Sequence, residues 1–377
     1  MRIVYLIAGT YRAAGMERVL ADKANWLAAH GHEVYVLTTD QMGRPSAFPL
    51  DPSIQIQDLG INYEENNGGS FLSKVLQYPL KQWRHRHRLA AILYTIQADI
   101  VISMFCNDVG FLPKIKDGSR KVLEVHFSRF KRLQYGRKGL WALADRLRSR
   151  TDLRHVRAFD KFVVLTEEDK RYWGDLPNIT VIPNSTSMKA DSPANLDSKT
   201  VIAVGRYSYQ KALDRLIDAW GIVMERLGRN CDWTLRLVGD GEMRSSLESQ
   251  IARLGLNASV FLGRVEKDMA SVYRESSILA LSSRYEGLPM VLLEAQAFGV
   301  PCVSFACKCG PKDVIRDGEN GLLIPEGDVS ALAEALYRLM SDDVLRKQMG
   351  AAAYRNSERY DKERIMSQWE SLFKELS

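Results

Sequence analysis

Short, uninterrupted apolar runs alternate with segments of helical periodicity along almost the whole of this 377-residue chain. The apolar runs are roughly four to seven residues long and rich in β-branched residues, which favours strands buried on both faces of a sheet. Strands separated in this way by helical segments are expected to lie parallel. The runs are RIVYLIAG (2–9), HEVYVLTT (32–39), ADIVISMF (98–105), KVLEVHFS (121–128), KFVVLTEED (161–169), TVIAVGR (200–206), WTLRLVGDG (233–241), SVFLGRV (259–265) and SILALSS (277–283).

The pattern occurs once in each half, and the chain is too long for one ordinary core. We therefore predict an α/β protein with two Rossmann-like parallel-sheet domains, at 1–182 and 200–355, joined by a polar, non-periodic linker at 183–199. A closing helix at 356–377 is expected to pack back toward the N-terminal domain, because apolar residues recur there at helical spacing (Ile365, Trp369, Leu372 and Phe373). Ligands of such domains bind at the carboxyl ends of the strands, so we expect the active site in a cleft between the two halves.

The positive charge of the chain belongs to its first half. Residues 1–182 hold 27 Lys/Arg and 19 Asp/Glu, and the remainder holds 25 and 27, which together give the formal net charge of +6. Two segments, 81–96 and 129–159, interleave Arg and Lys with Trp, Tyr, Phe and Leu. This pattern is compatible with a solvated helix surface, with attachment to an anionic membrane or capture of a lipid-linked diphosphate, and, third, with nucleic acid, although no nucleic-acid-binding motif is present.

The five cysteines are odd in number and form no CxxC pair, which favours reduced thiols in a cytosolic protein. Cys307 and Cys309 form a CxC, but no second pair of soft ligands accompanies it, so no metal site is expected. His85 and His87, two residues apart, do not share a helical face. The first apolar run is too short for a signal peptide, and no apolar run is long enough to cross a bilayer. We expect a cytoplasmic protein, with peripheral attachment to the inner face of the membrane as one alternative.

Two glutamates in SSRYEGLPMVLLEAQAFGVP (282–301) are the main candidates for chemistry. The pattern predicts a strand, a loop that carries Glu286, and a helix that Pro289 opens and Gly299 ends. The unpaired amides of that helix would seat a phosphate. Glu294 lies in an otherwise apolar helix, where a buried carboxylate is costly unless it is paired. It could accept hydrogen bonds from a ribose diol, or it could simply be an exposed residue on one helix face.

Arg206 and Lys211 follow the first strand of the second half. Two cations at a strand end, facing a helix N-terminus, suit a diphosphate, although solvated surface charges would show the same pattern. The loop GTYRAAGMERVL (9–20) lacks the G-x-G-x-x-G spacing of dinucleotide-binding loops, and the chain has no Walker A sequence. Gly15 is expected to be a glycine because a side chain there would block the approach of a phosphate.

The segment from Glu286 to Glu294 resembles the E-x7-E signature of the family-4 retaining glycosyltransferases of the GT-B fold. The resemblance extends over nearly the whole chain and is strongest over 200–330. It implies that Glu286 contacts the donor sugar, that Glu294 binds the ribose, and that Arg206 and Lys211 grip the pyrophosphate. It further implies a catalytic contact from His126, contacts of Arg264 and Val265 with the nucleobase, and backbone contacts from Gly15, Met16, Gly205, Gly287, Leu288, Met290 and Val291. Many relatives read E-G-F-G, whereas this chain has Pro289, which has no N–H to offer.

The resemblance implies transfer of a hexose or N-acetylhexosamine, with retention, from a nucleotide sugar to a glycan or lipid-linked acceptor. The donor is expected to be UDP-linked and the pathway to be bacterial surface-polysaccharide synthesis. No metal and no cofactor beyond the donor is expected, because D-x-D is absent from the chain and Arg206, Lys211 and helix amides can stabilise the leaving diphosphate. Two rivals stay open: a sugar-nucleotide epimerase, and a non-catalytic donor-binding subunit.

Overall fold

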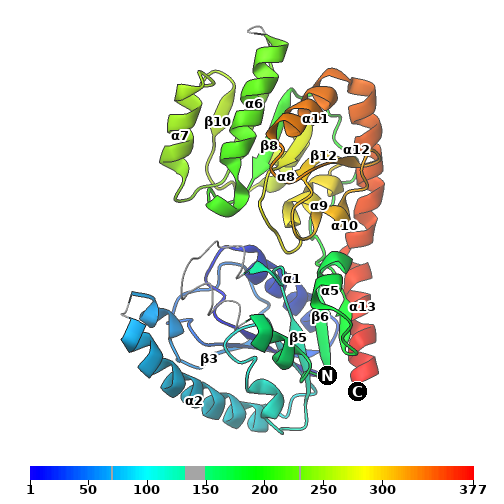
Figure 1. The fold of residues 1–377 in the computed structure, drawn as a ribbon. Coiled ribbons are helices and arrows are strands. Elements are labelled where there is room, and N and C mark those ends of the chain that lie inside the picture. The colour runs from blue at the N-terminus through cyan, green and yellow to red at the C-terminus, as the bar shows by residue number, and fades with distance from the viewer. Residues whose placement is uncertain (69–70, 132–148, 229–230) are drawn as a thin grey trace. The chain divides into compact units, whose positions relative to one another are not determined.

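The computed structural model describes residues 1–68, 71–131, 149–228 and 231–377. These residues form two compact units. The N-terminal unit consists of Met1–Leu165, Lys170–Pro183 and Ile365–Ser377, and the C-terminal unit consists of Thr166–Asp169 and Asn184–Arg364. The chain therefore returns to the N-terminal unit for its last helix (Figure 1). Among the described residues, no helix is both long and apolar enough to cross a bilayer.

The N-terminal unit is built on a seven-stranded sheet in the order β3-β2-β1-β4-β5-β6-β7. Every neighbouring pair is parallel, as predicted from the alternation. Its strands are β1 (Arg2–Ile7), β2 (Glu33–Thr38), β3 (Gln55–Asp58), β4 (Ile100–Ser103), β5 (Arg120–Glu124), β6 (Lys161–Val164) and β7 (Ile179–Val181). Its helices are α1 (Gly15–Ala29), η1 (Tyr63–Gly68), α2 (Phe71–Ile96), η2 (Leu112–Lys114), most of α5 (Glu167–Trp173) and most of α13 (Lys362–Leu376).

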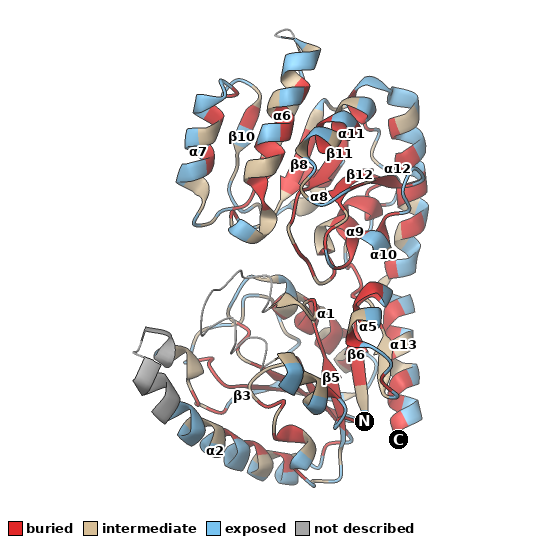
Figure 2. Cartoon of the chain, viewed as in Figure 1, coloured by how far each residue is buried: buried red, intermediate tan, exposed pale blue. Residues whose placement is uncertain are grey.

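The central strand β1 explains why the apolar runs are continuous. Its side chains alternate between two separate cores: Ile3, Tyr5 and Ile7 belong to one, and Val4 and Leu6 to the other. The first core also contains the apolar face of α13, including the fully buried Trp369 and Phe373. Figure 2 shows β5 mostly in the colour of buried residues, and α13 with both buried and exposed residues. A strand covered on both faces has no solvent side, so its sequence needs no polar alternation.

The C-terminal unit is built on a six-stranded parallel sheet in the order β10-β9-β8-β11-β12-β13. Its strands are β8 (Thr200–Val204), β9 (Thr234–Val238), β10 (Val260–Leu262), β11 (Ile278–Leu281), β12 (Cys302–Phe305) and β13 (Gly321–Ile324). Its helices are η3 (Tyr209–Lys211), α6 (Leu213–Leu227), α7 (Arg244–Arg253), α8 (Met269–Arg274), α9 (Met290–Ala297), α10 (Pro311–Val314), α11 (Val329–Ser341), α12 (Asp343–Ser357) and η4 (Glu358–Tyr360).

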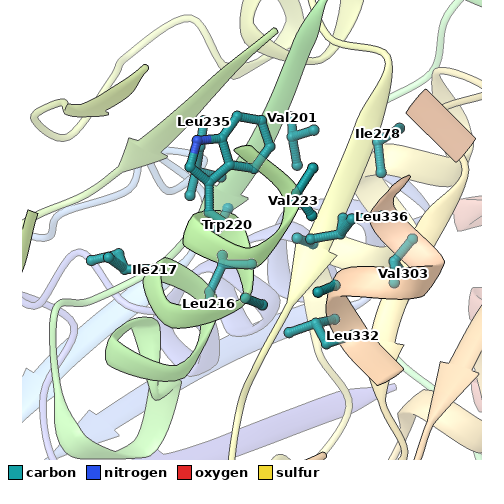
Figure 3. Close-up of a cluster of buried hydrophobic side chains, with 14 of the residues drawn as sticks. Val201, Leu216, Ile217, Trp220, Val223, Leu235, Ile278, Val303, Leu332 and Leu336 are labelled. Atoms are coloured by element: carbon teal, nitrogen blue, oxygen red, sulfur yellow. The ribbon is translucent and has the colours of Figure 1, made fainter. Parts of the chain in front are cut away.

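Trp220 marks the centre of the larger core of this unit. Figure 3 shows its indole between the strand residues Val201 and Leu235, with Leu336 of α11 nearby. The indole Nε1 donates a 3.1 Å hydrogen bond to Ser259 Oγ, so the one polar atom of this buried side chain is satisfied. Helices α6 and α11 thereby pack on the sheet whose loops, after β8 and β11, carry Lys211 and Glu286.

Candidate active site

The loop between β11 and α9 holds Glu286 in a nearly buried position, with 8% of the residue exposed. Two hydrogen-bond donors share its Oε1 atom: Lys211 Nζ at 2.7 Å and Ser283 Oγ at 2.6 Å. The other oxygen, Oε2, has only a long 3.5 Å contact with Nε2 of Gln210. One oxygen of the carboxylate is thus fixed, and the other can still accept a hydrogen bond from a ligand.

Lys211 reaches Glu286 across Gly205, at the carboxyl end of β8. A Cβ built on Gly205 would lie 2.9 Å from Lys211 Cε, and the backbone φ there is +152°, which favours glycine. Lys211 closes the short turn η3, and α6 begins two residues later, at Leu213. Ser282 Oγ donates a 2.9 Å hydrogen bond to the Lys211 carbonyl. The lysine is therefore held from both its backbone and its side chain.

The neighbouring cations of this edge differ in what they contact. Arg206 is exposed and, within the described part of the chain, has no side-chain hydrogen bond or ion pair. Arg284 is paired with Asp214 at 3.2 Å and lies over the ring of Tyr209, with 4.0 Å between Cζ and the ring centroid. Arg206 is thus the cation available to an incoming anion, while Arg284 stabilises the loop.

The N-terminus of α9 has open backbone amides. Its cap is Pro289, in an extended conformation and without a side-chain cap, so the proline precedes the helix rather than forming its first residue. Met290 and Val291 are half-buried, and their amides lack intrahelical acceptors by helix geometry. Gly310 packs against this turn: a Cβ there would lie 2.6 Å from Pro289 Cδ and 2.9 Å from the Gly287 carbonyl. Leu288 is buried beside them.

Glu294 lies one turn further along α9 and is buried, with 6% of the residue exposed. Its Oε2 accepts a 2.7 Å hydrogen bond from the hydroxyl of Tyr273 on α8, whose ring stacks on Phe298. Sequence reasoning missed Tyr273, because nothing in a 21-residue separation indicates contact. Ser283 was also missed, although a hydroxyl three residues before Glu286 is a recurrent local pattern.

The last two predicted residues of this unit follow β10. Arg264 and Val265 are both exposed, and 73% of Val265 is accessible. An exposed apolar side chain beside an exposed guanidinium is available for a flat ligand. Among the described residues, neither side chain forms a hydrogen bond or an ion pair with Lys211 or Glu286. A separate small cavity, of about 100 Å³, is lined by Thr186, Tyr354 and other residues, and by no predicted site residue.

In the N-terminal unit, Gly15 and Met16 begin α1, whose cap Ala14 provides no side-chain hydrogen bond. The amides at the start of α1 are therefore open. The protein itself does not require a glycine at position 15, because a Cβ there would meet nothing within 4 Å and the backbone φ is not left-handed. Any steric demand for glycine at this position has to come from a ligand.

His126 follows β5, which ends at Glu124 rather than at the histidine. Its Nε2 lies 3.2 Å from Glu124 Oε1, and only 6% of the His126 side chain is exposed. Glu124 also accepts two hydrogen bonds from Lys23 Nζ of α1, at 2.7 and 2.8 Å. Burial raises the pKa of Glu124, but the Lys23 ammonium and His126 outweigh it and bring that pKa to about 2. The carboxylate is charged at neutral pH.

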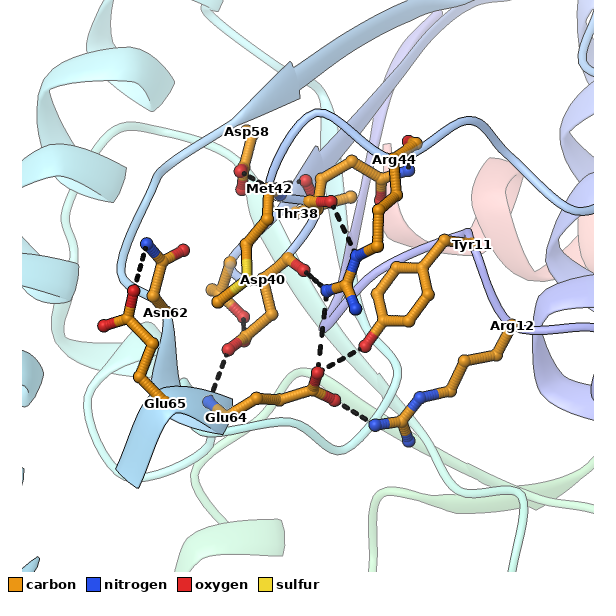
Figure 4. Close-up of polar contacts among 12 residues, drawn as sticks. Tyr11, Arg12, Thr38, Asp40, Met42, Arg44, Asp58, Asn62, Glu64 and Glu65 are labelled. Atoms are coloured by element: carbon orange, nitrogen blue, oxygen red, sulfur yellow. Dashed lines mark hydrogen bonds and ion pairs between the residues drawn. The ribbon is translucent and has the colours of Figure 1, made fainter. Parts of the chain in front are cut away.

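A second polar network surrounds the loop that precedes α1 (Figure 4). Glu64 of η1 accepts a 2.6 Å hydrogen bond from the Tyr11 hydroxyl, is paired with Arg12, and lies 3.5 Å from Arg44. The Arg44 guanidinium lies over the Tyr11 ring, and the Glu64 amide donates a 2.8 Å bond to Asp40. These contacts join the carboxyl ends of β1 and β2, and the sequence pattern did not indicate them.

Other expectations concern metals and the basic segments. Among the residues that the structure describes, no cluster of three or more His, Cys, Asp or Glu could hold a metal ion. Cys309 Sγ donates to Asp169 Oδ1 at 3.4 Å, and burial raises the pKa of the Cys307 thiol, so the CxC thiols lie in the protein interior. The basic segment 81–96 lies on α2, whereas most of 129–159, namely 132–148, falls outside the described residues.

Comparison with known proteins gives the family. Residues 13–188 match the model described as Glycosyltransferase Family 4, and residues 184–356 match the one described as Glycosyl transferases group 1. The amylovoran biosynthesis glycosyltransferase AmsD of Erwinia amylovora is 34% identical over 56% of this chain and 62% of its own length. For another relative the match spans only 24% of its length, so these matches cover less than two thirds of either protein.

A Campylobacter jejuni enzyme matches from end to end. It is 26% identical over 100% of this chain and 99% of its own, and its name describes an α-1,4-N-acetylgalactosaminyltransferase acting on a diphospho-undecaprenol-linked saccharide. Among solved structures, HepE of Anabaena, in complex with UDP-glucose, superposes with a TM-score of 0.74 over 99% of both chains at 18% identity. This likeness confirms the predicted GT-B fold. Since the two family models together match residues 13–356, the chain belongs to the glycosyltransferases, with a family 4 region followed by a group 1 region.

Proposed function

We propose that this protein transfers a hexose or N-acetylhexosamine, with retention and without a metal ion, from a UDP-linked donor to a glycan or lipid-linked acceptor in bacterial polysaccharide synthesis. The observation that carries the proposal is the arrangement in the C-terminal unit. Lys211 and Glu286 are joined at 2.7 Å, next to an unpaired Arg206 at a strand end and to the open N-terminus of α9. Two cations and helix amides at one sheet edge suit a pyrophosphate.

The cations act on the leaving group. As the bond between the anomeric carbon and the diphosphate oxygen breaks, negative charge grows on that oxygen, and Arg206, Lys211 and the α9 amides stabilise it. The acceptor hydroxyl attacks the anomeric carbon from the same face, and its proton passes to the departing phosphate oxygen. The products are the glycosylated acceptor and UDP, and no protein nucleophile is consumed.

The two glutamates bind rather than react. Glu286 keeps Oε2 for a sugar hydroxyl, because Lys211 and Ser283 occupy Oε1. Glu294, oriented by Tyr273, accepts from the ribose. A double displacement with a glutamate nucleophile would need two carboxylates about 5–5.5 Å apart flanking the sugar. We do not favour it, because Glu294 is held inside α9. Pro289 offers no amide, so the sugar has one backbone donor fewer than in E-G-F-G relatives.

Helix α2 supports peripheral attachment to an anionic membrane. Its 26 residues include Lys81, Arg84 and Arg86 and no acidic residue, and large side chains are exposed on it (Tyr78, Leu80, Trp83 and Tyr94). Exposed aromatic and cationic side chains on one helix favour the headgroup region of a bilayer. We place the protein at the inner face of the cytoplasmic membrane.

Vesicle flotation tests this attachment. The protein should float with anionic vesicles at low salt, and R84E/R86E should abolish flotation, while R253E, a charge reversal on α7, should not. Equal flotation at low and high salt, or none at all, would refute it.

The donor assignment is tested by thermal shift with UDP-, GDP- and ADP-sugars in the presence of EDTA. We expect stabilisation by UDP-sugars alone and its loss in Arg206→Ala. Arg253→Ala is the matched control, because Arg253 ends α7 and so lies at the opposite edge of the sheet. Conversion of the donor to its epimer without any acceptor would favour an epimerase, and donor binding without transfer would favour a non-catalytic subunit.

A further inference from the structure

We propose that the buried Lys23–Glu124 ion pair is a positioning device for His126 in the transfer reaction. This inference rests on the proposed function. Lys23 Nζ bonds to both oxygens of Glu124, and one of these oxygens, Oε1, lies 3.2 Å from Nε2 of His126. The three side chains are between 1% and 6% exposed, so water does not screen the contacts.

A charge pair in this place is costly as a purely structural element. It lies within an apolar core, and the ammonium of Lys23 is 3.5 Å from the ring centroid of Trp369. Burial lowers the pKa of Lys23, and the Glu124 carboxylate opposes that shift. Replacing a buried ion pair by well-packed apolar side chains is often neutral or stabilising. A fold that only needed to pack α1 on the sheet could do so with leucine and methionine.

The pair also connects two parts of the candidate site. Lys23 lies about two turns along α1 from Gly15 and Met16, whose open amides begin that helix. Glu124 is the last residue of β5, two residues before His126. The ion pair therefore fixes the amides at the start of α1 and the imidazole after β5 in one rigid arrangement within the N-terminal unit.

The carboxylate acts on the imidazole through the ring proton. A charged Glu124 beside Nε2 favours a proton on Nε2, so that Nδ1 is the ring nitrogen left to contact a substrate hydroxyl. Within the described residues, Nε2 has no well-aligned hydrogen-bond partner, so a small rotation of the ring toward Glu124 completes the contact. Lys23 keeps the carboxylate charged and in place.

The test replaces the pair by apolar residues of similar volume, as K23M/E124L. Glu124→Gln alone is unsuitable, because it would leave a buried lysine without its partner. The matched control is K121M/D117L, which removes another buried Lys–Asp pair at the opposite end of the same strand. Circular dichroism and thermal unfolding establish that each variant is folded.

We expect kcat of K23M/E124L to fall roughly tenfold to hundredfold with little change in the donor KM, and the control pair to stay within about twofold of wild type. The same double replacement in a His126→Ala background should cost almost nothing more, since the pair acts through the imidazole. Normal turnover in K23M/E124L, or an equal loss with and without His126, would overturn the proposal.

A second readout needs no activity and so separates this inference from the proposed function. Nitrogen-15 spectra of the His126 ring should show a protonated Nε2 and an unprotonated Nδ1 in the wild-type protein, and a changed tautomer mixture in K23M/E124L but not in K121M/D117L. Unchanged ring spectra would refute positioning. If the spectra change as expected but the wild-type protein transfers no sugar, the proposed function fails and the positioning of His126 stands.

Discussion

In the C-terminal unit, Arg206 is exposed and has no side-chain partner among the described residues, and one oxygen of Glu286 is nearly unoccupied. In the N-terminal unit, by contrast, the polar residues at the carboxyl edge of the sheet are engaged with one another. Glu124 contacts Lys23 and His126, and Glu64 contacts Tyr11, Arg12 and Arg44. Both units have the same parallel-sheet plan, so the difference lies in the side chains placed near the carboxyl ends of the strands.

This difference suggests a division of labour. We propose that the C-terminal unit keeps Arg206 and one oxygen of Glu286 for the donor, whereas the N-terminal unit uses its charges to shape a surface. Substitution of Arg206 should therefore affect chemistry without affecting stability, whereas substitutions in the polar networks of the N-terminal unit should affect both.

Arg206→Ala should lower kcat about 10²–10³-fold, the range found when one group that stabilises developing charge is removed. Glu286→Gln should also lose most turnover, because it removes the negative charge that holds Lys211 in place. Thermal unfolding without donor should hardly change for Arg206→Ala, because its side chain makes no ion pair in the described structure. Steady-state transfer from a UDP-sugar is the measurement. Near-normal turnover by Arg206→Ala would contradict the diphosphate assignment and remove the contrast between the units.

His85, on the buried face of α2, should make the N-terminal unit sensitive to acid. Burial lowers the pKa of His85 to about 4, so its contribution to stability is present above its unfolded pKa and is lost as the pH falls toward 4. Between pH 7 and 4.5 this loss amounts to about 2 kcal/mol. His85→Phe should remove it, since a phenyl ring can keep the edge contact with Phe111.

Urea unfolding of His85→Phe and of the wild-type protein, each measured at both pH values, isolates the contribution of His85 to the free energy of unfolding. The difference matters because burial raises the pKa of Asp108 to about 6, which acts with the opposite sign: that group favours the folded state at low pH and loses this effect as the pH rises through 6. A pH dependence that is the same with and without His85 would show that the histidine is solvated.

Tyr273→Phe should have the smallest effect, and it should be confined to donor binding. The hydroxyl donates a single 2.7 Å hydrogen bond to Glu294, worth about 1 kcal/mol, so the donor KM should rise about fivefold with kcat retained. Isothermal titration with UDP is the direct check. A fall in kcat at unchanged KM would mean that Glu294 takes part in the chemistry rather than in holding the ribose.

The fold could be predicted because each strand carries its own signal. In β1, every residue from Ile3 to Ile7 is buried, so the apolar run shows a two-sided sheet without knowledge of any partner. The E-x7-E spacing is similarly local, because one loop and one helix fix it. Boundaries were less certain: Pro289 caps α9 instead of opening it, and β5 ends before His126.

The parts of the candidate site that the sequence did not predict depend on which elements become neighbours in the fold. Lys23 and Glu124 are 101 residues apart, and Arg12 and Glu64 are 52 apart. Periodicity places each residue on a helix or strand, but it does not say which elements become neighbours in a seven-stranded sheet. The sequence indicated the ion pair in one way. Lys23 lies in the apolar face of α1, and a buried lysine requires a partner.

Helix α13 has a consequence for biosynthesis. Its residues Ile365, Met366, Trp369 and Phe373 complete a core whose other members lie mainly in the first 182 residues. The ribosome synthesises these residues only after the rest of the C-terminal unit. Until then an apolar face of the N-terminal unit stays uncovered, while the C-terminal unit can already fold. A nascent chain that stalls before residue 365 should therefore depend on chaperones more than its length alone would suggest.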